Sequence, residues 1–255
     1  MLSDSKITFI IPTIGRDTLI ATIQSIADQT CNKWNAIIVF DGVPPTIKID
    51  DYRFQILHID KMERPPDQMN SAGYVRNYGI KFATTEWVAF VDDDDTIRNT
   101  YVETFLQETA TYDTDVIIFR MVKFGKLEIS IKQIFDMVEA GIIKINKHTE
   151  KLYRHMDLDT LVVSNTITPF PETVATDLKK HDVGISFAVK KQIFNSGIQF
   201  NTSYIEDYEF LDTVRQNGYK MMISPYVMYF VREYTDFQDI ECNRLFINNA
   251  KQICV

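Results

Sequence analysis

The sequence predicts an α/β fold, in which helices flank a mainly parallel central sheet. Over residues 1–120, short runs of β-branched and aromatic residues alternate with segments whose apolar residues recur at helical spacing, which is typical of βαβ units. The strand-like runs are mostly apolar, as expected for strands that are covered on both faces. The 255 residues, 45% of them hydrophobic, suffice for a single globular domain spanning 1–255.

The charge balance excludes one broad class of partner. With 27 Lys and Arg against 35 Asp and Glu, the chain has a formal charge of −8. General nucleic-acid binding needs a basic surface, so no nucleic-acid partner is expected. An anionic nucleotide stays compatible with this charge, because a bound cation inverts the local field.

The ends and the cysteines indicate a cytoplasmic protein that can lie peripheral to a membrane. Residues 1–6 lack the basic and apolar regions of a signal peptide, and no transmembrane segment is expected because no apolar run approaches ~18 residues. The three cysteines, Cys31, Cys242 and Cys254, have no metal-ligand spacing, and an odd count suits a reducing compartment.

The first half of the chain opens with a βαβ unit. A strand is expected at Ile7–Ile11, ended by Pro12, which cannot donate to a sheet. A helix follows, with Asp17 or Thr18 at its N-cap. The other elements expected here are strands at Trp34–Phe40, Phe54–Ile59, Trp87–Val91 and Asp115–Phe119, and helices at Ser71–Ala83 and from Asn99 or Thr100 onward.

The second half is less regular. Lys61–Asn70 is a predicted loop of the first half. In the second half, Thr160–Asp177 is a predicted loop and Ile131–Ile143 has helical character. Regular structure is expected again as strands at Gly184–Val189, Tyr219–Ile223 and Tyr226–Val231, a helix from Tyr204–Phe210 to Asn217-Gly218, and a tail helix within 233–255.

The four consecutive aspartates Asp92–Asp95 follow directly on the predicted strand at Trp87–Val91. Four like charges repel one another, and a divalent cation relieves that repulsion because carboxylate oxygens are good ligands for Mg²⁺ or Mn²⁺. Ligands of open α/β sheets bind beyond the carboxyl ends of strands. The tetrad therefore predicts a metal site that holds a phosphate-bearing substrate. The alternative is a solvated acidic turn that caps the following helix.

Four blocks, in this order, resemble the inverting family-2 glycosyltransferases, which have the GT-A fold. They cover most of residues 6–232, and their joint order is more specific than any one of them. The blocks are Phe9-Ile10-Ile11-Pro12-Thr13, then Ile37-Ile38-Val39-Phe40-Asp41-Gly42, then Ala72–Ile80 leading into Phe90–Asp95, and finally Ile205–Phe210 with Arg215 and Gly218-Tyr219.

The resemblance implies a donor site in the half formed by residues 1–120. Pro12 and Thr13 would line the nucleotide base, and Asp41 would bind the base or the ribose. Arg76 matches the family arginine that contacts the donor phosphates or stabilises the site. Asp41-Gly42 is also an ordinary turn pair, which is the alternative at that position.

The resemblance also assigns the carboxylates. Asp92-Asp93-Asp94 matches the DxD motif, in which Asp92 and Asp93 belong to the donor-binding set and Asp94 reaches the metal, Mn²⁺ or Mg²⁺. Because four aspartates are consecutive, Asp93 or Asp95 could share that contact. Asp207 matches the catalytic base, in the half formed by residues 121–232, where the acceptor would also bind. A helix-terminal acidic pair is the alternative for Glu206-Asp207.

These features predict a metal-dependent inverting glycosyltransferase. It would transfer a sugar from a nucleoside-diphosphate sugar, with UDP-sugar expected, to a hydroxyl of a glycan, lipid-linked or protein-linked acceptor. A nucleotidyltransferase of similar fold is one alternative, although the usual Gly-rich basic phosphate loop is absent near the first strand. A non-catalytic glycan-binding relative is the other, and the presence of both Asp94 and Asp207 argues against it.

Overall fold

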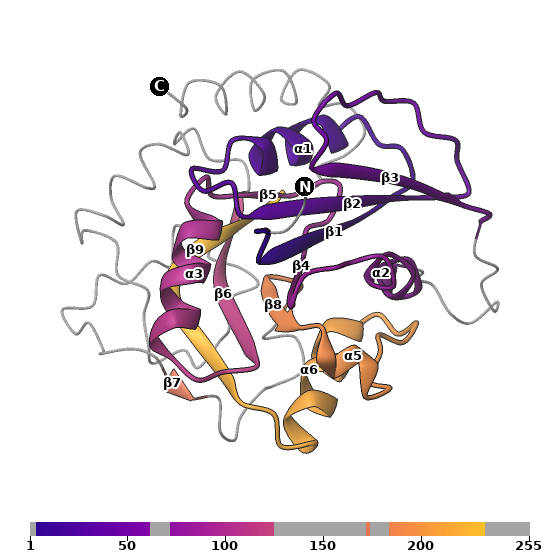
Figure 1. The fold of residues 1–255 in the computed structure, drawn as a ribbon. Coiled ribbons are helices and arrows are strands. Elements are labelled where there is room, and N and C mark those ends of the chain that lie inside the picture. Colours follow the sequence, from indigo (N-terminus) through magenta and orange to yellow (C-terminus); the bar gives the residue numbers. More distant parts are fainter. Residues whose placement is uncertain (1–3, 62–71, 125–171, 174–183, 233–255) are drawn as a thin grey trace.

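The computed structural model describes residues 4–61, 72–124, 172–173 and 184–232. Its helices are α1 (Leu19–Ala27), α2 (Ala72–Ile80), α3 (Tyr101–Thr111), α5 (Gln192–Asn195) and α6 (Glu206–Gln216). Its strands are β1 (Ile7–Thr13), β2 (Trp34–Asp41), β3 (Phe54–Ile59), β4 (Trp87–Phe90), β5 (Thr96–Ile97), β6 (Val116–Phe124), β7 (Glu172–Thr173), β8 (Phe187–Lys190) and β9 (Met221–Arg232). The described strands form one sheet in the order β3-β2-β1-β4-β8-β6-β9-β5, with β7 paired to β9 (Figure 1).

The first half of the sheet is parallel, as predicted. β1 pairs with β2 on one side and with β4 on the other, and β3 joins β2. The expected end of the first strand is wrong, because β1 continues through Pro12 to Thr13. Its pairing with β4 stops at Ile10, so at Pro12 the strand keeps only β2 as a paired neighbour in the described sheet. A strand accommodates proline best where one side is unpaired.

The second half makes the sheet mixed. β8 is antiparallel to both β4 and β6, whereas β6 and β9 are parallel. The prediction of two strands between 219 and 231 is wrong, because β9 is one strand of 12 residues. The pairing register with β6 shifts between Ile118 and Arg120 and again between Arg120 and Met121. The two predicted runs are therefore joined across an irregularity rather than separated by a turn.

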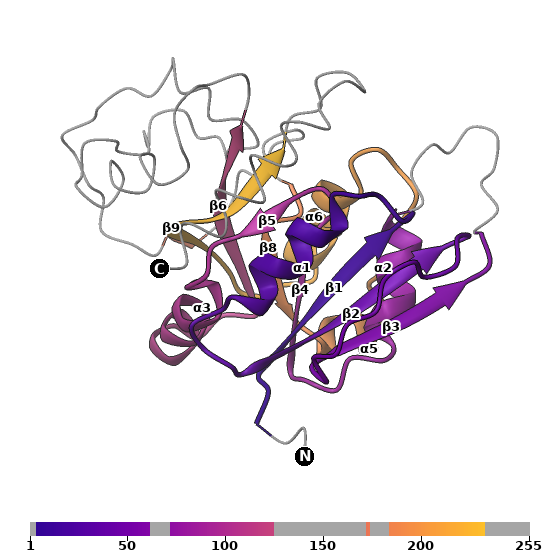
Figure 2. The same ribbon diagram turned by 90° about the horizontal axis from the view of Figure 1, so that it is seen from above.

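Helices cover both faces of the sheet. In Figures 1 and 2, α1 and α3 lie on one face, and α2, α5 and α6 lie on the other. Side chains of β1 alternate accordingly: the Phe9 ring packs 5.4 Å from the ring of Tyr101 in α3, while Ile10 packs against Gly79 in α2. This alternation follows from the two-residue period of a strand.

A cluster of phenylalanine rings fixes α6 beneath the sheet. The Phe200 ring lies 4.5 Å from that of Phe210 and 5.0 Å from that of Phe90, so α6 is connected to β4 through buried aromatic contacts. Such ring contacts stabilise beyond the area they bury. The start of α6 is therefore held at a defined distance from the end of β4.

Several predictions lie outside the described residues. These are the loop after Lys61, the helical segment Ile131–Ile143, nearly all of the loop Thr160–Asp177 and the tail 233–255. Strands from both predicted halves share one sheet. Among the described helices, none is long and apolar enough to cross a membrane.

Candidate active site

The four aspartates form a tight turn at the end of β4. The Asp95 amide donates to the Asp92 carbonyl at 3.0 Å, and β5 begins with the next residue, Thr96. The helix α3 starts later, with Thr100 at its N-cap position, as predicted. The alternative that the tetrad caps a helix is therefore wrong.

One aspartate, Asp93, has protein donors at both carboxylate oxygens. Thr13 Oγ1 donates to Oδ2 and Arg16 Nη1 to Oδ1, each at 2.6 Å. The carboxylate is almost fully buried, and buried charge is tolerated only when it is paired and hydrogen-bonded. Asp93 thus connects the turn to the end of β1. Thr13, which was also predicted to bind the nucleotide sugar, lies there.

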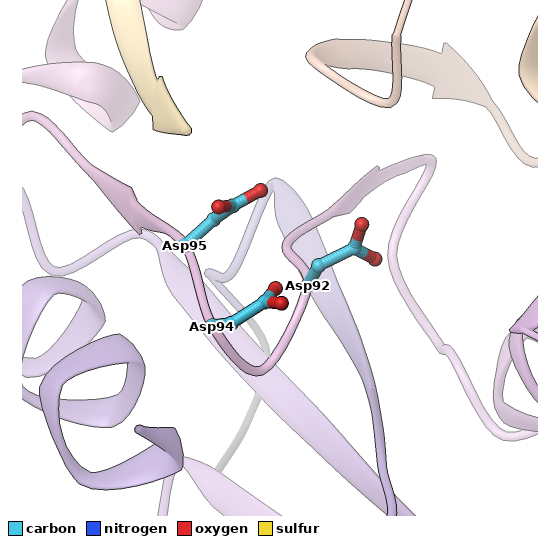
Figure 3. Close-up of side chains that lie close together, drawn as sticks. All are labelled: Asp92, Asp94 and Asp95. Carbon is cyan, nitrogen blue, oxygen red and sulfur yellow. The ribbon is translucent and has the colours of Figure 1, made fainter. Parts of the chain in front are cut away.

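The other three, Asp92, Asp94 and Asp95, form a cluster of possible metal ligands. Each offers a carboxylate oxygen, and these oxygens lie within 4.8 Å of one another. Figure 3 shows the three side chains projecting to the same side of the turn. The side chains of Asp92 and Asp94 keep 33% and 18% of their surface exposed, so a ligand can reach them. Three hard oxygen donors on one turn fit Mg²⁺ or Mn²⁺.

Buried hydroxyl groups hold the backbone of this turn. The Asp92 amide donates to the Tyr229 hydroxyl of β9 at 3.1 Å, and Thr22 of α1 donates to the Asp95 carbonyl at 2.7 Å. Burial raises the pKa of Tyr229 well above its usual value, and the negative charges of Asp95 and Asp92 raise that pKa further. Tyr229 therefore stays a neutral hydroxyl beside the carboxylates.

Arg76 of α2 connects this turn to the start of α6. Its Nη2 donates to Asp92 Oδ1 at 2.5 Å and its Nη1 to Glu206 Oε1 at 2.9 Å. Burial alone would lower the pKa of Arg76, but the charges of Asp92, Asp207 and Glu206 outweigh that effect and raise it. The guanidinium is therefore permanently charged.

Asp207 is the second residue of α6 and is only partly buried. A Cβ atom added to Gly184 would lie 3.9 Å from Asp207 Oδ2 and 2.8 Å from Met121 Cε. The absence of a side chain at Gly184 therefore keeps space beside the carboxylate.

The remaining predicted residues lie at neighbouring strand ends. Pro12 and Asp41 are buried near the ends of β1 and β2, which are adjacent and parallel. Gly42 follows with φ of 72°, and a Cβ there would come within 2.5 Å of Lys61 Cβ, so glycine is required for this turn. The structure directly connects Thr13 with Asp93 and Arg76 with Asp92, and it brings the charges of Arg76 and Asp207 together.

Sequence reasoning missed three contributors: Arg16, Glu206 as the partner of Arg76, and Tyr229. Arg16 could have been found from its place three residues after Thr13. Glu206 and Tyr229 could not, because their partners lie more than 100 residues away in the chain.

Comparisons with known proteins show which family this chain is similar to. The model of the family described as Glycosyl transferase family 2 matches residues 8–170. EpsH of Bacillus subtilis (strain 168) is 32% identical over 120 residues, which is 44% of this chain and 32% of EpsH. The glycosyltransferase GlyA of Streptococcus pneumoniae serotype 4 is 28% identical over 136 residues, or 50% of this chain and 18% of GlyA. The chain thus aligns with about a third or less of either relative.

Among solved structures, the crystal structure of S. aureus TarS 1–349 in complex with UDP-GlcNAc is similar to this one. Its TM-score is 0.59 at 14% sequence identity, and the match covers 91% of this chain and 59% of that one. This likeness shows a GT-A-type fold. Because the family model covers more than half of the sequence, the chain belongs to glycosyl transferase family 2.

Proposed function

We propose that this chain is a metal-dependent inverting glycosyltransferase that takes a sugar from a nucleoside-diphosphate sugar, with UDP as the nucleotide. The observation that carries the proposal is the gathering of Asp92, Asp94 and Asp95 on one turn, with Arg76 joining that turn to the start of α6, where Asp207 lies. Membership of the family and the UDP-GlcNAc complex of TarS support the choice of donor.

The donor would lie across the carboxyl ends of β1, β2 and β4, where parallel sheets bind nucleotides. Pro12, Thr13 and Asp41 would contact the base and the ribose, and Asp92 and Asp93 would complete the donor set. Asp94 would hold Mn²⁺ or Mg²⁺, with Asp92 and Asp95 close enough to share it. Such an ion supplies positive charge that offsets the charge developing on the departing diphosphate.

Asp207 would accept the proton of the acceptor hydroxyl. The hydroxyl oxygen then bonds to the anomeric carbon as the bond from that carbon to the diphosphate oxygen breaks on the opposite side. The configuration at the anomeric carbon is inverted by this displacement. The acceptor would be a hydroxyl of a glycan or of a lipid-linked or protein-linked saccharide.

Thermal-shift measurements with UDP-, GDP- and TDP-sugars in the presence of Mn²⁺ identify the donor, because a ligand raises the unfolding free energy according to its concentration over Kd. Donor hydrolysis is then compared in the wild type, Asp94→Ala, Asp207→Asn and the control Asp212→Asn, which removes one charge from a partly buried carboxylate further along α6. We expect hydrolysis in the wild type and the control and its loss in the two site variants. A wild type that neither binds nor hydrolyses any sugar nucleotide overturns the proposal.

A further inference from the structure

Arg76 is held from two sides by carboxylates that are 114 residues apart in the chain (92 and 206). Its side chain is 2% exposed, with Nη2 on Asp92 and Nη1 on Glu206. Asp92 belongs to the turn after β4, whereas Glu206 is the first residue of α6. One buried cation therefore joins the two elements that carry the proposed donor site and the proposed base.

A third carboxylate lies near the same cation. The charge of Asp207 acts on Arg76 together with those of Asp92 and Glu206. A buried guanidinium that loses one partner is left with an uncompensated N–H donor, which is strongly unfavourable. If Glu206 were absent, Asp207 would be the neighbouring carboxylate toward which Nη1 could turn.

Glu206 differs from the other acidic residues in the first turn of α6. Glu206 is 4% exposed, whereas Asp207 and Glu209 are only partly buried. Acidic residues favour a helix N-terminus through the helix dipole, but that effect does not require burial. Burial of Glu206 is explained by its ion pair with Arg76.

We infer that Glu206 is a positioning residue, which holds the Arg76 guanidinium against Asp92 and so keeps Asp207 available as the base. Its part in turnover rests on the proposed function, while its hold on Arg76 is a property of the fold. Glu206 contacts no reacting group in this scheme. Its removal should therefore lower kcat and leave the KM for the donor nearly unchanged.

Two variants separate the hydrogen bond from the charge. Glu206→Ala removes both, whereas Glu206→Gln keeps an oxygen that accepts from Nη1. Asp212→Ala is the control, because it also removes a carboxylate of α6 that forms an ion pair with an arginine, in this case with Arg215 at 2.6 Å. Hydrolysis of UDP-GlcNAc, UDP-glucose and UDP-galactose with Mn²⁺ gives kcat and KM. Guanidinium proton exchange, measured by NMR on ¹⁵N-arginine protein and assigned with Arg76→Lys, reports the anchoring directly.

For Glu206→Ala we expect kcat to fall about 100-fold, the loss typical of a small misplacement of reacting groups, and KM to change less than about threefold. Glu206→Gln should keep kcat within about tenfold of the wild type, since it restores the acceptor. Exchange of the Arg76 protons should be slow in the wild type and Asp212→Ala, faster in Glu206→Gln, which loses the charge of the ion pair, and fastest in Glu206→Ala.

Three results overturn the inference: a kcat in Glu206→Ala equal to that of Asp212→Ala, a rise in KM without a fall in kcat, or Arg76 exchange that Glu206→Ala leaves unchanged. If Glu206→Ala does not fold, faster Arg76 exchange in Glu206→Gln than in Asp212→Ala supports the inference, and equal exchange contradicts it. A wild type that hydrolyses none of the sugar nucleotides contradicts the proposed function instead, and the exchange rates still decide whether Glu206 holds Arg76.

Discussion

The Thr13 hydroxyl donates a hydrogen bond of 2.6 Å to Asp93 Oδ2, joining the end of β1 to the turn after β4. Arg16 completes the pairing of that carboxylate. Asp93 is thereby separated from Asp92, Asp94 and Asp95, whose oxygens lie together and whose side chains project to one side of the turn (Figure 3). Four chemically identical neighbours therefore divide into one buried carboxylate that is paired within the protein and three possible metal ligands.

Asp93→Asn should destabilise the fold. The amide lacks the charge that pairs with Arg16 and cannot accept hydrogen bonds at both positions, so this buried side chain loses its ion pair, at a cost of about 1–3 kcal/mol. Urea denaturation measures the loss in unfolding free energy. Asp94→Asn, at the next position, should cost less, because Arg16 lies at 3.5 Å from Asp94 Oδ2 but at 2.6 Å from Asp93 Oδ1. Equal stability of the two variants would contradict the division of the tetrad.

Asp94→Asn should instead weaken Mn²⁺ binding. An amide oxygen lacks the charge of a carboxylate, so we expect the affinity for Mn²⁺ in the presence of UDP to fall by about tenfold or more. The measurement is the electron paramagnetic resonance signal of free Mn²⁺ during titration, with Asp212→Asn of α6 as the control. If Asp95→Asn loses the metal and Asp94→Asn keeps it, Asp95 is the ligand.

Much of the parallel half of the fold could be predicted from local sequence. β3 has the predicted bounds, and β2 extends only one residue beyond its own. The apolar run of β2 is buried, the residues of β3 alternate as in a half-buried strand, and turn residues bound both. The position of the Asp tetrad at a strand end followed from the same reasoning. The start of β5 directly after the tetrad could not be predicted in this way, because a strand of two residues has no recognisable period.

The contacts of the site were less predictable, because they depend on topology. Insertion of β8 between β4 and β6 brings a segment from beyond residue 184 next to the tetrad strand, and nothing local in Phe187–Lys190 indicates its antiparallel direction. The Arg76–Glu206 pair depends on that same arrangement. The family resemblance placed Arg76 and Asp207 in one site, but it did not identify Glu206 as the partner of Arg76.

Gly73→Ala should destabilise the protein although alanine favours helices. A Cβ at this position of α2 would lie 2.3 Å from the Asn201 carbonyl oxygen and 3.0 Å from Phe200 Cβ, so the helix must move away. We expect the unfolding free energy to fall by about 1–3 kcal/mol because of overpacking. At an uncrowded helix position, the same substitution would raise it. Urea denaturation measures it, with Tyr74→Ala at the adjacent, 39% exposed position as control. Unchanged stability would show that α2 is not held closely against the segment at Asn201.

The same displacement should lower turnover, because α2 carries Arg76. Donor hydrolysis in Gly73→Ala should therefore fall more than in Tyr74→Ala at a temperature where both variants are folded. Full activity in a destabilised Gly73→Ala protein would show that the helix adapts without moving the guanidinium.

Glu108 provides a test away from the site. Its side chain on α3 is 7% exposed, and its Oε2 atom has no hydrogen-bond partner within the described structure. Burial raises the pKa of Glu108 above its usual value. The folded state consequently binds the proton more tightly than the unfolded state does, so Glu108 costs stability as the pH rises from the ordinary glutamate pKa of about 4.3 through the raised folded value.

Glu108→Gln should therefore raise Tm at pH 7, by a few degrees if about 1 kcal/mol is recovered in a chain of this size. The gain should vanish near pH 4 and below, where glutamate is already protonated in both states. Thermal unfolding between pH 4 and 8 measures the difference, and Glu103→Gln, in the first turn of the same helix, is the control. Glutamate there is favoured by the helix dipole, so its replacement should not raise Tm at pH 7. A gain for Glu108→Gln that is equal at all pH values would mean that packing, rather than the buried charge, limits stability at this position.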